Sequence, residues 1–546
     1  MSFAFTKHGL NGRAWQNQRF FEMIPGLTSW GILVGMVVLS WTKPVVAAVF
    51  IIAFLLYWLL KLIYMTFFLI LSYYRLTIER KTDWMARIDG IDFLEAYLKN
   101  LRQKLPFSTL GKRLSLSIQK KELEALKKSG CPPPFSKDIY HLVIFPVIKE
   151  PAEIIELGVD SLSRQSFPIN RMLVVFALEE RAKEEIKKDV FALEKKYKNK
   201  FLEIMTVVHA SDLPGEARVK GANVTFAAKV ARKFFDEKNI PLEHVIVSCF
   251  DADTIVGTDY FSCLTYSFMV TPTRIQSSFQ PIPVYHNNIW QVPGFARVIE
   301  AGSSFFQLIE ATNPEKLVTF SSHSMSFKAL VDVDYWPVDM ISDDSAIYWK
   351  SFLHYDGQYR VVPMYVTVSM DIAAKDTFWR TMRSIYRQKR RWAWGVENFP
   401  IVMRGFLKTD KISLYDKIRY GFKLLEGHVS WATWGFLLIF ISWLPLLLSN
   451  GEFSSSVLYY NTPRIAKTIF HLGLLSLLIS MLISIWLLPK RNVRHRLFKE
   501  IGHALEWLLI PFILVFFSSL PSLDAQTRLL LGRYMEFWVS EKKRKN

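Results

Sequence analysis

The sequence is poor in cysteine and lacks the cysteine patterns that bind metal or form a disulfide framework. Only Cys131, Cys249 and Cys263 occur in 546 residues, with no C-x-x-C pair and no grouping with histidine. Neither a zinc site nor a disulfide scaffold is therefore indicated, and a reducing compartment fits this composition. No nucleic-acid-reading module occurs either, so the net charge of +19 does not indicate a nucleic-acid partner.

Apolar sequence, in contrast, is abundant. Hydrophobic residues make up 51% of the chain and aromatic residues 15%, more than soluble proteins usually carry. Lys and Arg cluster beside the apolar segments, where they would meet anionic lipid headgroups. We therefore expect an integral, multi-pass membrane protein.

The first apolar region, residues 27–72, is long enough for a hairpin of two membrane-spanning helices. A secretory signal peptide is the alternative, but the 26 residues before this region are long and a second apolar run follows at once. Basic residues flank the hairpin on both sides, which places both flanks in the cytosol. The central region is accordingly expected on the cytosolic side of the plasma (inner) membrane.

Short apolar runs alternate with charged helical segments in the centre of the chain. The runs lie at residues 141–147, 172–177, 202–208 and 244–249. This alternation is typical of strands and helices in a sheet that helices cover on both faces. It predicts an α/β, Rossmann-like domain with a mixed, mostly parallel sheet, combined here with α-helical transmembrane segments.

The remaining boundaries follow from composition. Two apolar spans near 428–448 and 465–488 can each cross a membrane, whereas the apolar segment near 504–520 is short and contains Pro511, which favours a re-entrant or interfacial arrangement. The expected segments are a cytosolic N-terminus (1–26), a transmembrane hairpin (27–74), a charged helical linker (75–139), the α/β domain (140–400), an interfacial helix (401–427), transmembrane helices with the re-entrant or interfacial segment (428–520) and a basic cytosolic tail (521–546).

Two acidic residues follow the last of the apolar runs. Asp251 and Asp253 form a D-x-D pattern directly after residues 244–249. Side chains two residues apart can point the same way, so both carboxylates can project from the carboxyl end of a strand, where open α/β sheets bind ligands. Such hard oxygen ligands suit Mg²⁺ or Mn²⁺, which would in turn hold a diphosphate. An ordinary acidic turn is the alternative.

Two further patterns lie downstream. Asp343 and Asp344 open an expected helix, where they could also act only as an N-terminal cap. The segment QKRRW at residues 388–392 lies on a basic, aromatic helix that starts near Asp376. Alone, it would indicate an amphipathic helix on a membrane surface.

The order of these patterns resembles the membrane-bound family-2 glycosyltransferases, such as the cellulose, chitin and hyaluronan synthases. D-x-D, an acidic pair about 90 residues later and Q-x-x-R-W at residues 388–392 match that family in sequence order. Smaller matches are Glu150 after the first strand, Lys220 and Asn223 in a K-x-x-N segment, and Gln280. The resemblance covers about residues 140–395. It implies a GT-A-type domain and an inverting, metal-dependent transfer of sugar from a nucleotide donor, a UDP-sugar first of all, to a growing polysaccharide.

The resemblance also implies roles for single residues. Asp344 would be the catalytic base, Asp251 and Asp253 would hold the metal ion and the donor, and Arg391 would contact the pyrophosphate. The full set of expected donor contacts is Glu150, Glu179, Glu180, Lys220, Asp251, Asp253, Gln388, Arg391 and Trp392. The expected acceptor contacts are Asp343, Trp392 and Trp394. In one departure from the family, the second strand ends in Glu179 and Glu180 where the family has an Asp that contacts the nucleotide.

The tail carries a last similarity. Phe537, Val539, Ser540 and Lys542 resemble the F-x-V-T-x-K gating loop of cellulose synthases, with Ser in place of Thr. Such a loop would require a cytosolic tail and favours the re-entrant arrangement of residues 504–520. A basic stop after the last membrane segment is the alternative.

Other functions are compatible with parts of the sequence. Single transfer of a sugar to a membrane lipid uses similar motifs in the ceramide and polyprenyl-phosphate transferases. A nucleotide-binding transporter or membrane scaffold is a further alternative. A glycosidase also uses two carboxylates, but the cytosolic placement and the D-x-D pattern argue against it. No feature of the sequence indicates an oligomeric state.

Overall fold

A computed structural model describes residues 3–211, 213–448, 451–489 and 496–536. The chain forms two compact units, and each is described by itself below. The sheet unit comprises Met1–His8, Ser72–Asn287 and Phe306–Asp371, and the helical unit comprises Gly9–Leu71, Asn288–Phe305 and Ile372–Asn546.

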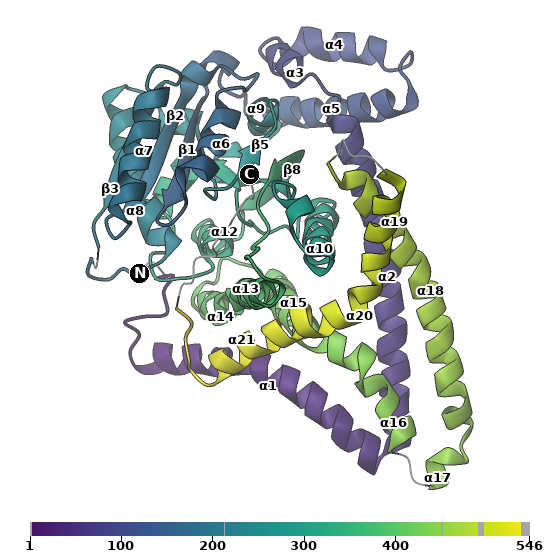
Figure 1. The fold of residues 1–546 in the computed structure, drawn as a ribbon. Helices are drawn as coiled ribbons and strands as arrows, with labels where there is room; N and C mark the ends of the chain where they lie inside the picture. The colour runs from purple at the N-terminus through teal and green to yellow at the C-terminus, as the bar shows by residue number, and fades with distance from the viewer. Residues whose placement is uncertain (1–2, 212, 449–450, 490–495, 537–546) are drawn as a thin grey trace. The chain divides into compact units, whose positions relative to one another are not determined.

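The sheet unit is built on eight strands in the order β3-β2-β1-β4-β7-β6-β8-β5 (Figure 1). Neighbours among β1 to β4 run parallel, as do β6 and β8, whereas β7 is antiparallel to β4 and β6, and β5 is antiparallel to β8. The strand bounds are β1 Tyr140–Val147, β2 Met172–Glu179, β3 Glu203–His209, β4 Val245–Cys249, β5 Ile255–Val256, β6 Ser277–Val284, β7 Ser324–Ser326 and β8 Arg360–Ser369. The predicted α/β domain with a mixed, mostly parallel sheet is confirmed, and the four predicted apolar strands are β1 to β4.

The parallel register brings the loops after β1, β2 and β3 to one edge of the sheet. Val147 pairs with Leu178, and Glu179 pairs with His209. Strands β1 and β2 are rich in Val, Leu and Phe and are buried along most of their length because helices pack on them. The helices of this unit are α6 Ala152–Leu162, α7 Glu184–Tyr197, α8 Lys220–Glu237, α9 Tyr260–Val270, α11 Phe327–Asp332 and α12 Asp343–His354, and α10 Gly294–Ala311 belongs to the helical unit up to Phe305.

A helical linker precedes β1. It consists of α3 Trp84–Ile91, α4 Leu94–Lys104 and α5 Leu110–Ser129. Both α3 and α5 pack against α9, so the linker is part of the sheet unit. Gly130 ends α5 with a positive φ of 66°, which favours glycine at this helix end.

The helical unit contains the long apolar helices. Its helices are α1 Gly12–Thr42, α2 Pro44–Glu79 up to Leu71, α13 Phe378–Ala393, α14 Asn398–Lys408, α15 Leu414–Ile439, α16 Leu444–Leu447, α17 Gly451–Ser454, α18 Val457–Leu487, α19 Arg496–Glu506, α20 Ile510–Ile513 and α21 Leu520–Leu530. Within this unit α1 packs on α14, α15 and α21, and α13 packs on α21 (Figure 1).

Four helical stretches of the described chain are long and apolar enough to cross a membrane: Gly12–Thr42, Pro44–Glu79, Val457–Leu487 and Ile501–Leu530. The pair Leu414–Ile439 and Ile441–Leu447, bent by 47°, would add a fifth span if it crosses as one. These helices bear out the predicted apolar helices as elements, while their path through a membrane stays a prediction.

Two elements differ in extent from the sequence pattern. The interfacial helix expected at residues 401–427 is divided between two helices, since α14 ends at Lys408 and α15 begins at Leu414 and continues without interruption through Ile439. The apolar segment near 504–520 belongs to the longer helical stretch Ile501–Leu530. The sequence shows where an apolar segment begins and ends, but the hydrogen bonds of the helix continue into the polar residues on either side.

Candidate active site

The D-x-D acids follow β4, as expected, but their side chains have different partners. Asp251 accepts a hydrogen bond from Ser321 Oγ at 2.6 Å, and its side chain is about a quarter exposed. Asp253 is buried, and its Oδ2 accepts a hydrogen bond from the backbone N–H of Asp371 at 2.6 Å. Asp251 is thus the member of the pair that faces the cluster described next.

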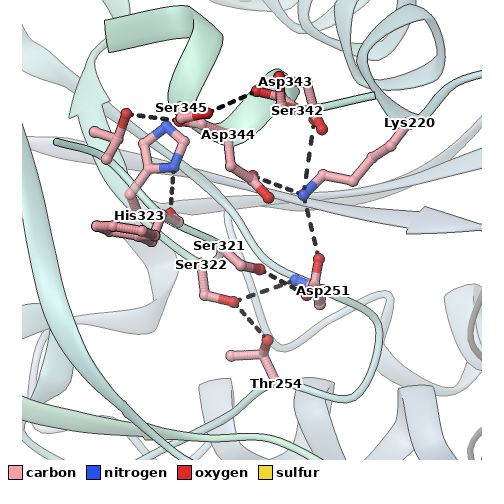
Figure 2. Close-up of polar contacts among 12 residues, drawn as sticks. Lys220, Asp251, Thr254, Ser321, Ser322, His323, Ser342, Asp343, Asp344 and Ser345 are labelled. Carbon is pink, nitrogen blue, oxygen red and sulfur yellow. Dashed lines mark hydrogen bonds and ion pairs between the residues drawn. The ribbon is translucent and has the colours of Figure 1, made fainter. Parts of the chain in front are cut away.

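A lysine ammonium joins the D-x-D segment to the acidic pair of α12 (Figure 2). Lys220 Nζ lies 3.2 Å from Asp251, 3.8 Å from Asp343 and 2.8 Å from Asp344. Burial opposes the charged form of Lys220, but the three carboxylates outweigh burial and raise its pKa well above the usual value. The ammonium therefore stays charged and holds together acids that lie far apart in the sequence.

The backbone around this acidic cluster leaves no room for larger residues. Lys220 and Gly221 open α8, and a Cβ at Gly221 would lie 2.2 Å from the carbonyl oxygen of Pro337. Asp343 opens α12, as the sequence predicts. Thr319 Oγ1 donates a hydrogen bond to the Asp344 carbonyl oxygen at 2.6 Å. The start of α8 and the segment before α12 are thus packed backbone against backbone.

A polar loop before β7 completes the cluster, and the sequence patterns did not identify it. Ser322, with a positive φ of 61°, exchanges a hydrogen bond with Thr254 at 2.8 Å, and His323 Nδ1 lies 2.9 Å from the Phe320 carbonyl oxygen (Figure 2). Gln280 Oε1 accepts a hydrogen bond from the Phe320 N–H at 2.8 Å, so Gln280 supports this loop. The run of small polar residues at 319–324 was the available signal.

The expected nucleotide contacts near β2 and β3 surround a second hollow. Glu179 forms an ion pair with Arg181, and Glu180 Oε2 accepts a hydrogen bond from the Ser211 N–H at 2.8 Å. His209 Nε2 lies 2.9 Å from Glu216. The hollow is lined by Glu179, Arg181, His209, Ala210, Ser211, Leu213, Glu216, Ala217, Arg218, Val219 and Ala222.

Two other matches to the family pattern have local partners. Glu150 Oε2 accepts hydrogen bonds from the N–H groups of Ile148 and Lys149, at 2.8 and 2.9 Å. Asn223 Nδ2 donates to the Ala177 carbonyl oxygen at 2.7 Å, and its side chain is buried. Asn223 therefore fixes the end of β2 against α8.

The Q-x-x-R-W segment lies on α13, which belongs to the helical unit. Lys389, between Gln388 and Arg391, is buried and binds Glu300 at 3.0 Å and Ser303 at 2.8 Å. Its ammonium also lies 3.8 Å from the ring centre of Trp392. Burial lowers the pKa of Lys389, which Glu300 opposes. Sequence reasoning missed this buried pair because its partners are far apart in the chain.

Trp394 differs from its expected role. Its side chain is fully buried and its Nε1 donates a hydrogen bond to Glu397 Oε2 at 3.0 Å. A ring enclosed in this way presents no face to an acceptor sugar, so the structure does not support Trp394 as an acceptor contact. The expected gating residues Phe537, Val539, Ser540 and Lys542 lie outside the described residues.

Carboxylates are the metal ligands that the acidic cluster offers. In the described part of the chain, no group of three or more His, Cys, Asp or Glu side chains is arranged to hold a metal ion. Mg²⁺ commonly uses one or two carboxylates together with substrate phosphates. Asp251, which faces the acidic cluster, is a carboxylate of the kind that such a site uses, whereas Asp253 is buried and its Oδ2 is bonded to the Asp371 N–H.

No protein-family model matches the chain. Among curated proteins it is similar to the poly-beta-1,6-N-acetyl-D-glucosamine synthase of Staphylococcus epidermidis, with 27% identity over 209 residues that cover 37% of this chain and 45% of the relative. The synthase of the same name from Staphylococcus aureus (strain COL) is 30% identical over 177 residues, which cover 31% and 39% of the two chains. The matched region thus spans less than half the length of these relatives.

Two glycosyltransferase structures give weak matches. A mannosyltransferase from Pyrobaculum calidifontis in complex with GDP-Man and Mn²⁺ has a TM-score of 0.40 and 12% identity, covering 82% of this chain and all of the other. TarS residues 1–349 of S. aureus in complex with UDP-GlcNAc has a TM-score of 0.34 and 14% identity, covering 61% and 90%. Scores of this size leave the fold to be judged from the strands and helices themselves.

Proposed function

We propose that this chain is an integral membrane glycosyltransferase of family-2 type, which transfers sugar from a nucleoside diphosphate donor to a growing polysaccharide on the cytosolic side of the plasma (inner) membrane. The observation that carries the proposal is the meeting of Asp251, Asp343 and Asp344 at the ammonium of Lys220. The acids of two separate motifs gather there, after the carboxyl end of a buried strand. The polymer product is supported by the names of the curated relatives.

The proposed reaction is a single displacement. The acceptor hydroxyl oxygen attacks the anomeric carbon on the face opposite the diphosphate, the bond from that carbon to the diphosphate oxygen breaks, and the bonding electrons leave with the nucleoside diphosphate. Asp344 accepts the hydroxyl proton. Its side chain is about a quarter exposed, so an acceptor can reach it, and Lys220 holds its carboxylate in place.

Charge balance supports a divalent cation. Three ionised carboxylates and one ammonium leave two net negative charges in the acidic cluster, and a donor diphosphate adds more. Like charges at such distances repel strongly in a partly buried site. Asp251 and Asp253 would hold Mg²⁺ or Mn²⁺, which neutralises the diphosphate when bound.

Residues outside the acidic cluster are proposed to bind the ends of the two substrates. The hollow bounded by Glu179 and Arg181 would accept the nucleoside, UDP first of all, because it lies beside the ends of β2 and β3. Arg391 would donate to the pyrophosphate with its planar guanidinium. Lys389 covers one face of Trp392, so an acceptor sugar would stack on the other face.

The proposal is tested by incubating the detergent-purified full chain with nucleotide sugars and Mg²⁺ or Mn²⁺, starting with UDP-N-acetylglucosamine. Nucleoside diphosphate release is measured and any product is sized. Asp344→Asn should lower turnover by roughly 10²-fold or more, the range for loss of a general base, while donor binding persists. Asp236→Asn, at an exposed acid on α8, is the matched control and should retain turnover.

Each outcome separates the functions considered. A long product establishes polymer synthesis, whereas a lipid carrying one or two sugars identifies the single-transfer alternative. Full turnover of the Asp344→Asn protein contradicts the role of Asp344. Release of no nucleoside diphosphate from any donor contradicts the enzyme assignment and favours a transporter or scaffold.

A further inference from the structure

The loop between α4 and α5, together with the first residue of α5, exposes two apolar side chains. Phe107 is 93% exposed and Leu110 80% exposed, the highest values among the large apolar residues of the described chain. The loop is held by its own hydrogen bonds: Ser108 Oγ donates to the Lys104 carbonyl oxygen at 2.9 Å, and Arg113 Nη2 donates to the Pro106 carbonyl oxygen at 2.7 Å. The apolar side chains are therefore presented by a formed loop.

The charged residues in the loop and in the chain beside it are all basic, although Arg102 pairs with Glu124 of α5. Residues 99–113 contain no Asp or Glu, and the basic residues among them are Lys99, Arg102, Lys104, Lys112 and Arg113. Lys104 and Lys112, which flank the exposed pair, are themselves exposed. Exposed apolar side chains flanked by basic residues are suited to a membrane surface, which has anionic headgroups outside and an apolar interior.

The loop lies beside the end of α2, within the sheet unit. Gly111, in the first turn of α5, is so close that a Cβ there would be 3.7 Å from Ile78 Cγ1 and 3.8 Å from the Tyr74 hydroxyl. The apolar run of α2 ends at Leu71 and is followed by two tyrosines and Arg75. Aromatic and basic residues in this order mark the level where a helix leaves the bilayer.

We propose that this loop docks on the membrane surface, with Phe107 and Leu110 inserted among anionic lipid headgroups beside α2. The contact would give the sheet unit a second attachment to the bilayer besides the continuous helix α2, and so restrict its rotation about that helix. The proposal rests on α2 crossing the membrane, which is part of the proposed function, but it requires no sugar transfer. Its test therefore uses no donor.

The test places an environment-sensitive fluorophore at single cysteines in the full chain, reconstituted in lipid nanodiscs. The background is Cys131→Ser, because Cys131 is exposed and the other two cysteines are buried. Phe107→Cys reports on the loop. Leu60→Cys, an exposed position in the apolar run of α2, is the positive control, and Phe191→Cys is the matched negative control.

Phe191 is a suitable match because it is an exposed aromatic residue on α7, where four basic and four acidic residues balance each other. Quenching by lipids brominated on their acyl chains is measured in discs of phosphatidylcholine alone and in discs that also contain phosphatidylglycerol. We expect the label at 107 to be quenched in the anionic discs, the label at 60 in both, and the label at 191 in neither. Lys104→Glu with Lys112→Glu should remove most of the quenching at 107.

Three results would overturn the proposal. In the first, the label at 107 stays unquenched, as at 191, while the label at 60 is quenched. This result shows that α2 lies in the bilayer but that the loop does not dock on it. Quenching at 107 could survive the double charge reversal, which excludes the electrostatic attraction. Absence of quenching at 60 would remove α2 from the bilayer and the loop with it, whatever the enzyme assay shows.

Discussion

Gly221 offers a sharp test of how the acidic cluster is assembled. A Cβ at this position would lie 2.2 Å from the Pro337 carbonyl oxygen and 3.4 Å from Cβ of Asp343. Cβ atoms essentially never approach another heavy atom closer than 3.0 Å. Gly221→Ala therefore requires the start of α8 and the segment before α12 to separate by at least 0.8 Å. Both contacts involve backbone or Cβ atoms, which cannot rotate away.

The separation should affect catalysis more than stability. Lys220 precedes Gly221, and Asp344 follows Pro337 by one short segment, so the movement pulls the ammonium from the carboxylates. A misplacement of about 1 Å can cost on the order of 10²-fold in rate, and we expect kcat/KM to fall by about that factor. Alanine also favours helix over glycine by up to about 1 kcal/mol, which offsets part of the strain.

The assay is nucleoside diphosphate release over a range of donor concentrations, with thermal unfolding followed by tryptophan fluorescence. Gly302→Ala is the matched control, because Gly302 lies in α10 with no atom within 4 Å of its added Cβ. That variant should keep wild-type turnover. Wild-type kcat/KM in the Gly221→Ala protein would refute the close approach as the determinant of the cluster.

Four further substitutions, two of them combined in a double-mutant cycle, test other buried groups. Lys220→Met should lower stability by about 2–3 kcal/mol, below the 3–5 expected for a fully buried pair because two of the carboxylates are a quarter exposed. The raised pKa of Lys220 means that its stabilisation is complete below its unfolded pKa of about 10.4, so the difference in unfolding free energy between wild type and variant should stay constant between about pH 6 and 9. Burial lowers the pKa of His141 to about 3, so below about pH 6.5 the unfolded chain binds a proton that the folded chain does not bind, and acid favours unfolding. The unfolding midpoint should therefore fall less steeply with acid in His141→Gln than in the wild type. An equal slope in both proteins would show that His141 is not buried in its neutral form. Lys389→Met and Glu300→Gln should each destabilise more than the double variant does, and additive effects in a double-mutant cycle would exclude their coupling.

The elements that the sequence predicted are those set by local pattern. Strands β1 to β4 follow from short apolar runs, and the helix that opens at Asp343 follows from its acidic first turn. Both signals are contained in a few consecutive residues. The resemblance to a family identified the candidate acids, but it did not predict which of their side chains lie within reach of one another.

The contacts that the sequence did not predict join distant residues. Nothing near Lys220 in the chain indicates that its ammonium binds Asp344, 124 residues away. The burial of Trp394 against Glu397 depends on packing in the helical unit, although a Trp in that motif suggests an exposed ring. The sequence shows Gly221 only as a glycine at the start of a helix, and its close approach to the Pro337 carbonyl oxygen is visible only in the folded chain. Each case is decided by tertiary contacts that residue type alone leaves open.

The charge balance of the acidic cluster links its resting arrangement to donor binding. Lys220 supplies a positive charge at hydrogen-bonding distance from both Asp251 and Asp344. A divalent cation held by Asp251 would take over part of that neutralisation, and the ammonium would then repel the cation at short distance. The four-carbon stem of lysine allows the ammonium to turn towards the arriving diphosphate without movement of α8.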